Sequence, residues 1–134
     1  MAHLTGCVIH NNENFAEKEK AKVQIGEQIW QTEVANNDKL RQRGLMFREK
    51  LNENEGMIFV FNYSAPHSFW MKNTLIPLDI IWISEDLKVV DVQTLEPCLH
   101  DPCPSYQPKQ KAKYVLEINA GKFRGKIGDK VKIQ

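Results

Sequence analysis

Short apolar segments bounded by glycine, proline, asparagine and aspartate run through most of this 134-residue chain. Segments of that kind, rich in β-branched and aromatic residues, are typical of β-strands. A two-residue hairpin turn is expected at Gly26-Glu27. A short helix is expected over residues 39–43, with the cluster Asn36-Asn37-Asp38 at its start and Gly44 at its end. We therefore expect an all-β domain with one or two short helices, as an antiparallel β-sandwich, a jelly-roll-like fold or a partly closed barrel. About eight strands are expected, over residues 22–25, 28–35, 57–61, 67–71, 78–83, 87–95, 114–119 and 130–133.

Composition limits the other fold classes. Hydrophobic residues make up 42% and charged residues 26% of the chain, as in ordinary globular proteins. The longest apolar run, over residues 57–61, is far shorter than the ~20 residues of a membrane-spanning helix. The sequence shows neither strand–helix alternation nor a glycine-rich phosphate loop, so a nucleotide-binding fold is not expected. We expect residues 1–21 to be a disordered polar tether and residues 22–134 to be a single domain.

Of the three cysteines, the first stands apart. Leu4-Thr5-Gly6-Cys7 resembles the cleavage site of a bacterial lipoprotein signal, in which the cysteine is acylated and becomes the mature N-terminus. The charged and apolar parts of such a signal do not precede it here. A trimmed signal and an accidental match both fit, and we favour the first because residues 10–20 are polar like a tether. The expected location is the cell envelope or periplasm, with a lipid anchor at Cys7.

Several longer motifs are recognisable, among them Arg43-Gly-Leu-Met-Phe-Arg48, Glu55-Gly-Met-Ile-Phe-Val-Phe61, Phe69-Trp-Met-Lys-Asn-Thr-Leu-Ile-Pro-Leu-Asp-Ile-Ile81 and Tyr114-Val-Leu-Glu117. With these motifs the chain resembles the DUF192 family over residues 22–134. The resemblance implies a small, mostly β, jelly-roll-like domain of bacteria and archaea that is often exported or lipid-anchored. Because the function of the family is unknown, the resemblance assigns no catalytic residue.

The other two cysteines, Cys98 and Cys103, lie in a loop with four prolines. A disulfide between them would fit an oxidising compartment and would fix the shape of the loop. A zinc ion held by both cysteines with His100 and His67 is a second interpretation, and a redox pair is a third. The sequence lacks a second zinc knuckle and the C-x-x-C spacing of redox enzymes, so it favours the disulfide. We expect no metal and no cofactor.

The segment around Trp70 carries the most distinctive side chains. On a strand, Trp70 and Lys72 point to one face while Phe69 and Met71 point to the other. With Phe69 and Met71 in the core, Trp70, Lys72 and Asn73 would form an exposed patch that recognises a glycan ring or an aromatic side chain. The alternative is structural, with Trp70 covering the core and Asn73 forming a turn.

Two acidic residues, Asp79 and Glu117, interrupt apolar strands. A buried carboxylate must be paired or hydrogen-bonded, or its pKa rises. For Asp79 a structural role is favoured, in which it accepts backbone N–H groups of a loop or pairs with a cation. The alternative is a ligand anchor or a general base, and a pair taken from Asp79, Glu117 and His67 would then be catalytic. The candidate ion-pair partners of Asp79 are Arg43, Arg48 and Lys72.

Charge is unevenly distributed although the net charge is +1. Residues 109–134 hold eight basic and two acidic side chains, which gives +6, and the rest of the chain carries −5. The alternation in Lys130-Val-Lys132-Ile predicts the solvent side of an edge strand, where lysines discourage pairing between sheets. The alternative is a patch for lipid headgroups, a polyanionic glycan or nucleic acid. Nucleic acid is not expected, because few aromatic residues accompany these cations.

These features favour a binding or accessory module of the cell envelope, without enzymatic activity, whose ligand is a glycan, a peptide or another small molecule. The alternatives are a small hydrolase or lyase and a structural subunit of an envelope complex. The membrane would be contacted only through the lipid anchor. Among the candidate residues, Arg43 fits either an anion grip or a cation at the end of a helix. The candidate ligand-binding residues are Arg43, His67, Trp70, Lys72, Asn73, Asp79 and Tyr106.

Overall fold

The computed structural model describes residues 18–134, which fold into nine strands and one helix. Two local predictions are confirmed. A two-residue turn joins the first two strands, and the side-chain oxygen of Asn37 accepts the N–H of Leu40 at 2.9 Å where the helix begins. Gly44, with a φ of 50°, ends the helix. The elements are β1 (Lys20–Ile25), β2 (Gln28–Ala35), α2 (Asp38–Arg43), β3 (Glu55–Ala65), β4 (Phe69–Trp70), β5 (Leu78–Ile83), β6 (Val89–Leu95), β7 (Ser105–Tyr106), β8 (Ala112–Asn119) and β9 (Val131–Ile133).

Seven strands form one sheet in the order β6-β5-β8-β3-β2-β1-β9, and β4 pairs with β7 as a separate ribbon. All neighbours in the large sheet run antiparallel except β2 and β3, which are parallel. A parallel pair needs a crossover connection, and α2 with the loop after it supplies that crossover. The all-β prediction is confirmed, while the parallel pair is a feature that the sequence patterns did not reveal.

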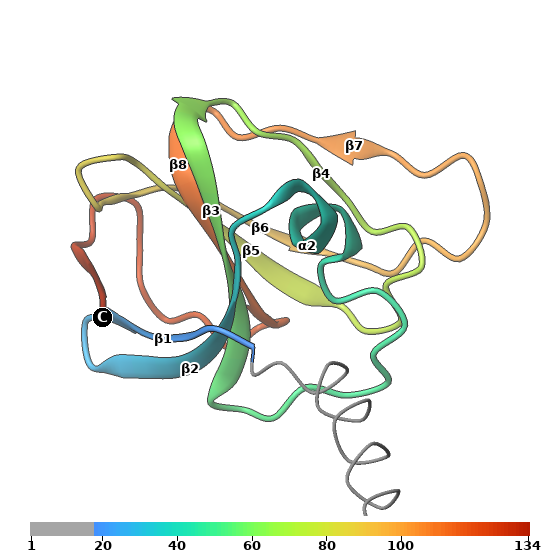
Figure 1. Cartoon of the computed structure of the whole chain (residues 1–134), viewed down its shortest axis with the longest axis horizontal. Helices are drawn as coiled ribbons and strands as arrows, with labels where there is room; N and C mark the ends of the chain where they lie inside the picture. The colour runs from blue at the N-terminus through green and yellow to red at the C-terminus, as the bar shows by residue number, and fades with distance from the viewer. Residues whose placement is uncertain (1–17) are drawn as a thin grey trace, which may run out of the picture.

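The two ends of the sheet approach each other, so the sheet curls into a partly closed barrel (Figure 1). The N–H of Val89 donates to the carbonyl of Asp129, and the N–H of Val131 donates to the carbonyl of Leu87, each at 2.9 Å. Lys88 and Lys130 are bridge partners between the same two segments. Of the three architectures that the sequence allowed, the partly closed barrel is the one that forms.

The sheet separates two hydrophobic clusters. The inner cluster lies inside the curl, because it includes Val89 and Val131 at the seam together with Ile58, Ile81 and Leu116. The outer cluster lies on the other face, under the segments that contain α2, β4 and β7 (Figure 1). Its largest fully buried members are Trp82, Phe59, Leu45 and Met71.

The domain begins slightly earlier than expected. Strand β1 starts at Lys20, so the last two residues of the predicted tether belong to the sheet. Strand β4 covers two residues rather than the expected segment 67–71. The expected acylation site Cys7 lies outside the described residues. Within the described part of the chain, no helix has the length and apolar character needed to cross a bilayer.

Candidate functional site

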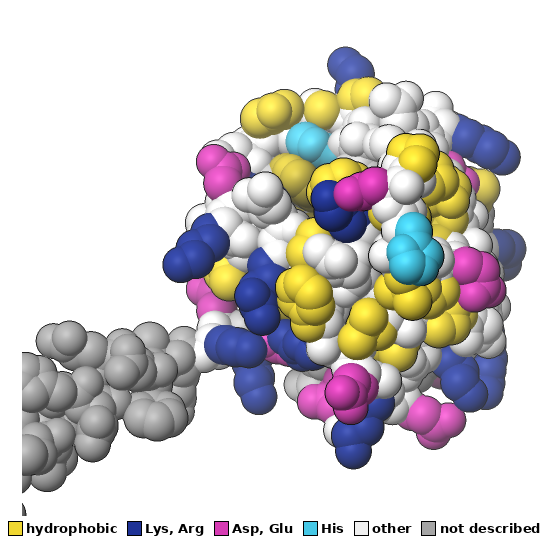
Figure 2. Space-filling model, turned by 90° about the vertical axis from the view of Figure 1, so that its right-hand side faces the viewer, with side chains coloured by type: hydrophobic (Ala, Val, Ile, Leu, Met, Phe, Trp, Pro, Cys, Tyr) yellow, Lys and Arg dark blue, Asp and Glu magenta, His cyan; other side chains and the backbone are white. Residues whose placement is uncertain are grey.

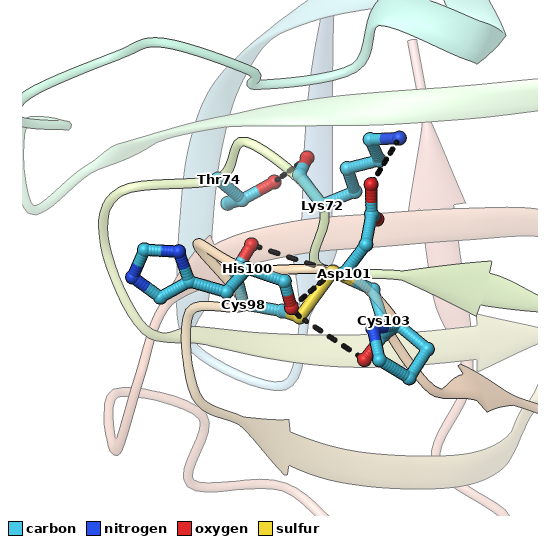
Figure 3. The surroundings of a disulfide bond; sticks show 7 residues. Lys72, Thr74, Cys98, His100, Asp101 and Cys103 are labelled. Carbon is cyan, nitrogen blue, oxygen red and sulfur yellow. Dashed lines mark hydrogen bonds and ion pairs between the residues drawn. A yellow bond between two sulfur atoms is a disulfide. The ribbon is translucent and has the colours of Figure 1, made fainter.

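The predicted disulfide between Cys98 and Cys103 is present. It closes a small ring in the loop between β6 and β7, and this loop is tied to the turn after β4 (Figure 3). The N–H of Cys98 donates to the carbonyl of Met71 at 3.2 Å, and the N–H of Asn73 donates to the carbonyl of Cys98 at 3.3 Å. The disulfide loop therefore supports the segment that carries Trp70 and Lys72. Because both sulfur atoms are bonded to each other, they are not free to hold the zinc ion of the second interpretation.

Removing both cysteines should loosen this loop. A disulfide that closes so short a ring contributes about 2 kcal/mol through the entropy of the unfolded chain. We expect the variant Cys98→Ser/Cys103→Ser to lose about that much unfolding free energy, measured by urea denaturation. The inner cluster does not contact the loop, so hydrogen exchange should accelerate after β4 and in the loop rather than in β8. Uniform acceleration across the sheet would contradict a local role.

The side chains of Trp70 and Lys72 meet on the surface, as the sequence predicted. The Lys72 Nζ lies 5.3 Å from the centre of the Trp70 ring, and 3.3 Å from a carboxylate oxygen of Asp101. Figure 3 shows the Lys72 and Asp101 side chains directed at each other, with the His100 ring pointing away. Trp70 is 44% exposed, whereas Met71 is buried and Phe69 packs against the outer cluster. The ion pair orders the lysine beside an indole face that solvent can reach.

Three exposed apolar side chains lie on the segments next to this pair. Phe47 and Leu99 are each 58% exposed, and Leu75 is 40% exposed. The N–H of Phe47 donates to the carbonyl of Asn73 at 2.8 Å, which brings the loop after α2 beside the turn after β4. Figure 2 shows hydrophobic side chains gathered around a cation–carboxylate contact on this side of the molecule. We call this area the Trp70 surface, defined by Phe47, Trp70, Lys72, Asn73, Leu75, Leu99 and Asp101.

Two residues of the Trp70 surface have a left-handed backbone. Phe47 has a φ of 66°, which costs a bulky residue about 1 kcal/mol or more, and Asn73 has a φ of 56°, which asparagine adopts more readily. The same two residues share the hydrogen bond that joins the two loops. Sequence patterns missed Phe47, Leu75, Leu99 and Asp101, because only the folded backbone brings their three segments together.

The structure excludes Asp79 from this surface. Asp79 is 3% exposed, and both its carboxylate oxygens have partners within the protein. One oxygen accepts the hydroxyl of Thr94 at 2.6 Å, and the other accepts the N–H groups of Lys122 and Phe123 at 3.1 Å each. Asp79 thus fixes the turn after β8, which is the kind of structural role that the sequence favoured, and its alternative assignment as a ligand-binding residue is corrected. Lys72, Arg43 and Arg48, the partners proposed from sequence, do not pair with it.

Glu117 is buried on the other face of the sheet. Its cross-strand neighbours are Met57 and Ile80, which belong to the outer cluster, whereas Asp79 is paired with Ile118 of the inner cluster. Neighbouring residues on a strand point to opposite faces, so the two carboxylates project away from each other. Glu117 is 4% exposed, and this burial raises the pKa of its carboxyl to about 8. The predicted Asp79–Glu117 dyad is therefore wrong.

His67 and Tyr106 have structural contacts beside the Trp70 surface. The His67 ring stacks on Phe61 with 3.6 Å between ring centres, and its Nε2 lies 3.0 Å from the carbonyl oxygen of Tyr63. Tyr106 is half-buried and pairs with Phe69 across the small ribbon. Among residues 18–134, no hydrogen bond or ion pair joins His67 to Asp79 or Glu117. The same residues contain no group of three or more His, Cys, Asp or Glu side chains that could hold a metal ion.

Arg43 lies at a separate cleft that the sequence did not predict. Two adjoining hollows of about 340 and 350 Å³ share Lys18, Glu33 and Arg48, and Arg43 lines the more apolar one with Leu40. Between them, Arg48 donates two hydrogen bonds to Glu33, at 2.5 and 2.9 Å. These bonds hold the pKa of Glu33 down to about 2. No hydrogen bond or ion pair connects Arg43 to the Trp70 surface in the described part of the chain.

The chain is a small, partly closed β-domain with an exposed apolar surface next to a disulfide. Residues 20–133 match the model of the DUF192 family, which carries the description "Uncharacterized ACR". The chain belongs to this family, as the motifs around Arg43, Glu55 and Phe69 predicted.

Relatives of known sequence and structure agree with this assignment. A UPF0127 protein of Pyrococcus abyssi is 34% identical over 107 residues, which cover 74% of this chain and 82% of the relative. A UPF0127 protein of Pyrococcus horikoshii is 30% identical over 113 residues, covering 77% and 89%. The crystal structure of a putative transcription regulator from Sinorhizobium meliloti aligns with a TM-score of 0.78 and 27% identity, covering 88% of this chain and 96% of that one. A protein of unknown function from Novosphingobium aromaticivorans aligns with a TM-score of 0.73 and 32% identity, covering 86% and 84%.

Proposed function

We propose that this protein is a binding module of the cell envelope, and that its Trp70 surface contacts an apolar segment of another envelope protein. The observation that carries the proposal is the exposed Trp70, flanked by apolar side chains and held beside the Lys72–Asp101 ion pair. Tryptophan at the centre of an apolar patch, with a few directional polar groups, is typical of residues that dominate binding energy at protein interfaces.

Rigidity supports the same function. The disulfide and three backbone hydrogen bonds, those of Phe47, Asn73 and Cys98, fix the Trp70 surface before any partner arrives. A preorganised surface loses less conformational entropy on binding than a flexible one. A hydrolase or lyase is not favoured, because the acidic candidates point to opposite faces of the sheet.

A peptide selection tests this function. We expect peptides selected from a random library against the full chain to bind through the Trp70 surface, and Trp70→Ala/Lys72→Ala to weaken them at least thirtyfold by calorimetry. Tyr63→Ala is the matched control, because Tyr63 is 66% exposed outside that surface, and it should change affinity less than twofold. Peptide affinity that is the same for the double variant and the native chain would overturn the proposal. Binding to a glycan array that depends on Trp70, without any peptide binding, would replace the protein partner with a sugar.

Export and a lipid anchor at Cys7 are part of the proposal. The Cys98–Cys103 disulfide supports them, because disulfides persist in oxidising compartments. Intact-mass analysis of the gene product from its own cells should show acylation at Cys7 and the loss of two hydrogens from the cysteine pair. An unmodified, fully reduced chain would contradict both statements.

A further inference from the structure

We propose that one side of the barrel rests on an anionic phospholipid surface. Five exposed lysines from three adjacent segments of the sheet form this side, which we call the lysine face. They are Lys20, Lys22, Lys88, Lys130 and Lys132.

Strand register places these lysines together. In β1, Lys20 and Lys22 alternate with Val23 and Ile25, which point into the inner cluster. Gln24 pairs with Lys132, so the outward side of β1 continues onto β9. Lys130 lies on the same side as Lys132, because the two are two residues apart on an extended chain. The bridge between Lys130 and Lys88 extends the face to the segment before β6.

Protection of an open sheet edge does not account for all of these charges. Lysines that alternate on a last strand usually prevent pairing of an open edge, as the sequence suggested. Here that edge is already occupied over residues 128–131, which hydrogen-bond to residues 87–89. The closure also sets Lys88 directly opposite Lys130, and like charges in such a cross-strand pair destabilise a sheet. An arrangement that costs stability and protects no open edge at this seam fits an external partner of opposite charge.

Few acidic side chains neutralise the lysine face. Within residues 18–134, Asp86 is the one carboxylate in ion-pair range of these five lysines, 4.0 Å from Lys88. The neighbouring Glu33 is held by Arg48 and Lys18. The face therefore carries an excess of about four positive charges, which a polyanionic surface would match.

The shape and composition of the face favour lipid headgroups over nucleic acid. The exposed aromatic residues of the described chain, Phe47, Tyr63 and Trp70, lie on other elements, so bases would find no stacking partners among the lysines. The side chains between the lysines are polar, such as Gln24 and Gln134. Charged and amide groups distributed over a wide area suit the many anionic headgroups of a bilayer. Each lysine near such a surface contributes about a fivefold gain in affinity.

The entry point of the chain agrees with this orientation. Lys20 opens β1, so the N-terminal segment joins the domain at the lysine face. The chain between Cys7 and Lys20 can span at most ~45 Å, which would keep an acylated Cys7 and the lysine face at one membrane. The anchor belongs to the proposed function, but the lysine face acts without it, and the test therefore uses the unacylated chain.

Vesicle sedimentation of the full 134-residue chain tests the proposal. We expect binding to vesicles of 30% phosphatidylglycerol in phosphatidylcholine at 0.1 M NaCl, and its loss in pure phosphatidylcholine or at 0.5 M NaCl. The variant Lys22→Gln/Lys130→Gln/Lys132→Gln should bind about a hundredfold more weakly, from three lysines at about fivefold each. These side chains are exposed, so the variant should fold, which circular dichroism checks.

The matched control removes the same net charge elsewhere. Lys39→Glu/Gln42→Glu on α2 also lowers the net charge by three, and its vesicle affinity should change less than twofold. The affinity of Trp70→Ala/Lys72→Ala for vesicles should fall at most about fivefold, the contribution of one lysine. This variant therefore distinguishes lipid binding by the lysine face from peptide binding by the Trp70 surface. The proposal would be overturned if the triple variant and the α2 control lost vesicle affinity equally, or if the native chain showed no preference for phosphatidylglycerol. Tighter, equally lysine-dependent binding to a 20-mer DNA duplex at the same salt would also overturn it.

Discussion

The Glu117→Gln variant should lose most of the pH dependence that the native protein shows between pH 5 and pH 8. Burial raises the pKa of Glu117 to about 8, against an ordinary value of 4.5. The folded protein keeps a proton that the unfolded chain releases above pH 4.5, so the stabilising effect is complete below that pH and is lost as pH rises toward 8. For the native chain we expect the free energy of unfolding to fall by on the order of 3 kcal/mol between pH 5 and 8.

Urea denaturation at four pH values across this range measures the effect. Glutamine has the shape of the protonated acid and does not ionise, so the variant should show a nearly flat profile and exceed native stability at pH 8. Glu53→Gln is the control, because Glu53 forms an exposed ion pair with Lys122 at 3.3 Å. Its profile should follow the native one. A native protein whose stability stays constant up to pH 8 would show that Glu117 is not held protonated.

Asp79→Ala is expected to cost about 4 kcal/mol of unfolding free energy at pH 7. The change leaves three donors without an acceptor, the hydroxyl of Thr94 and the N–H groups of Lys122 and Phe123. Hydrogen bonds to a buried charge contribute more than neutral ones, and an abandoned buried donor costs about 1–3 kcal/mol. Asp79→Asn should be less damaging, because its amide oxygen can still accept the two N–H groups while its NH₂ donates to the hydroxyl oxygen of Thr94, so that mainly the charge of the acceptor is lost.

Glu85→Gln provides the comparison for Asp79. Glu85 pairs with Lys113 at 3.5 Å on the surface, where an ion pair contributes little. The comparison variant should stay within about 0.5 kcal/mol of the native protein. If Asp79→Ala remained within 1 kcal/mol as well, Asp79 would not anchor the turn after β8. The structural role given to the Asp79 carboxylate would then be wrong.

Local structure in this protein could be predicted from sequence, because it depends on neighbouring residues. The hairpin turn at Gly26, the cap at Asn37 and the end of the helix at Gly44 each follow from the conformational preference of one residue type. The pairing of Trp70 with Lys72 was also predictable, because alternation along an extended segment fixes which side chains share a face.

The partners of the buried carboxylates could not be predicted in the same way. Every residue of β5 is buried, so the usual alternation of apolar and polar side chains does not show which face Asp79 occupies. Two of its partners lie more than forty residues away, in the turn after β8, and the third is Thr94 on β6. Strand register also decides that Glu117 points to the opposite face. Both facts belong to the tertiary fold and leave no local pattern.

The pairing of β1 with β9 orders the events of folding during synthesis. Val23 is paired with Ile133, roughly 110 residues later in the chain. The ribosome therefore releases one of the two sheet partners of β1 long after β1 itself has emerged. Contacts between such distant segments slow folding, because a large loop must close before they can form. The barrel therefore cannot close until residues 131–133 have left the exit tunnel of the ribosome.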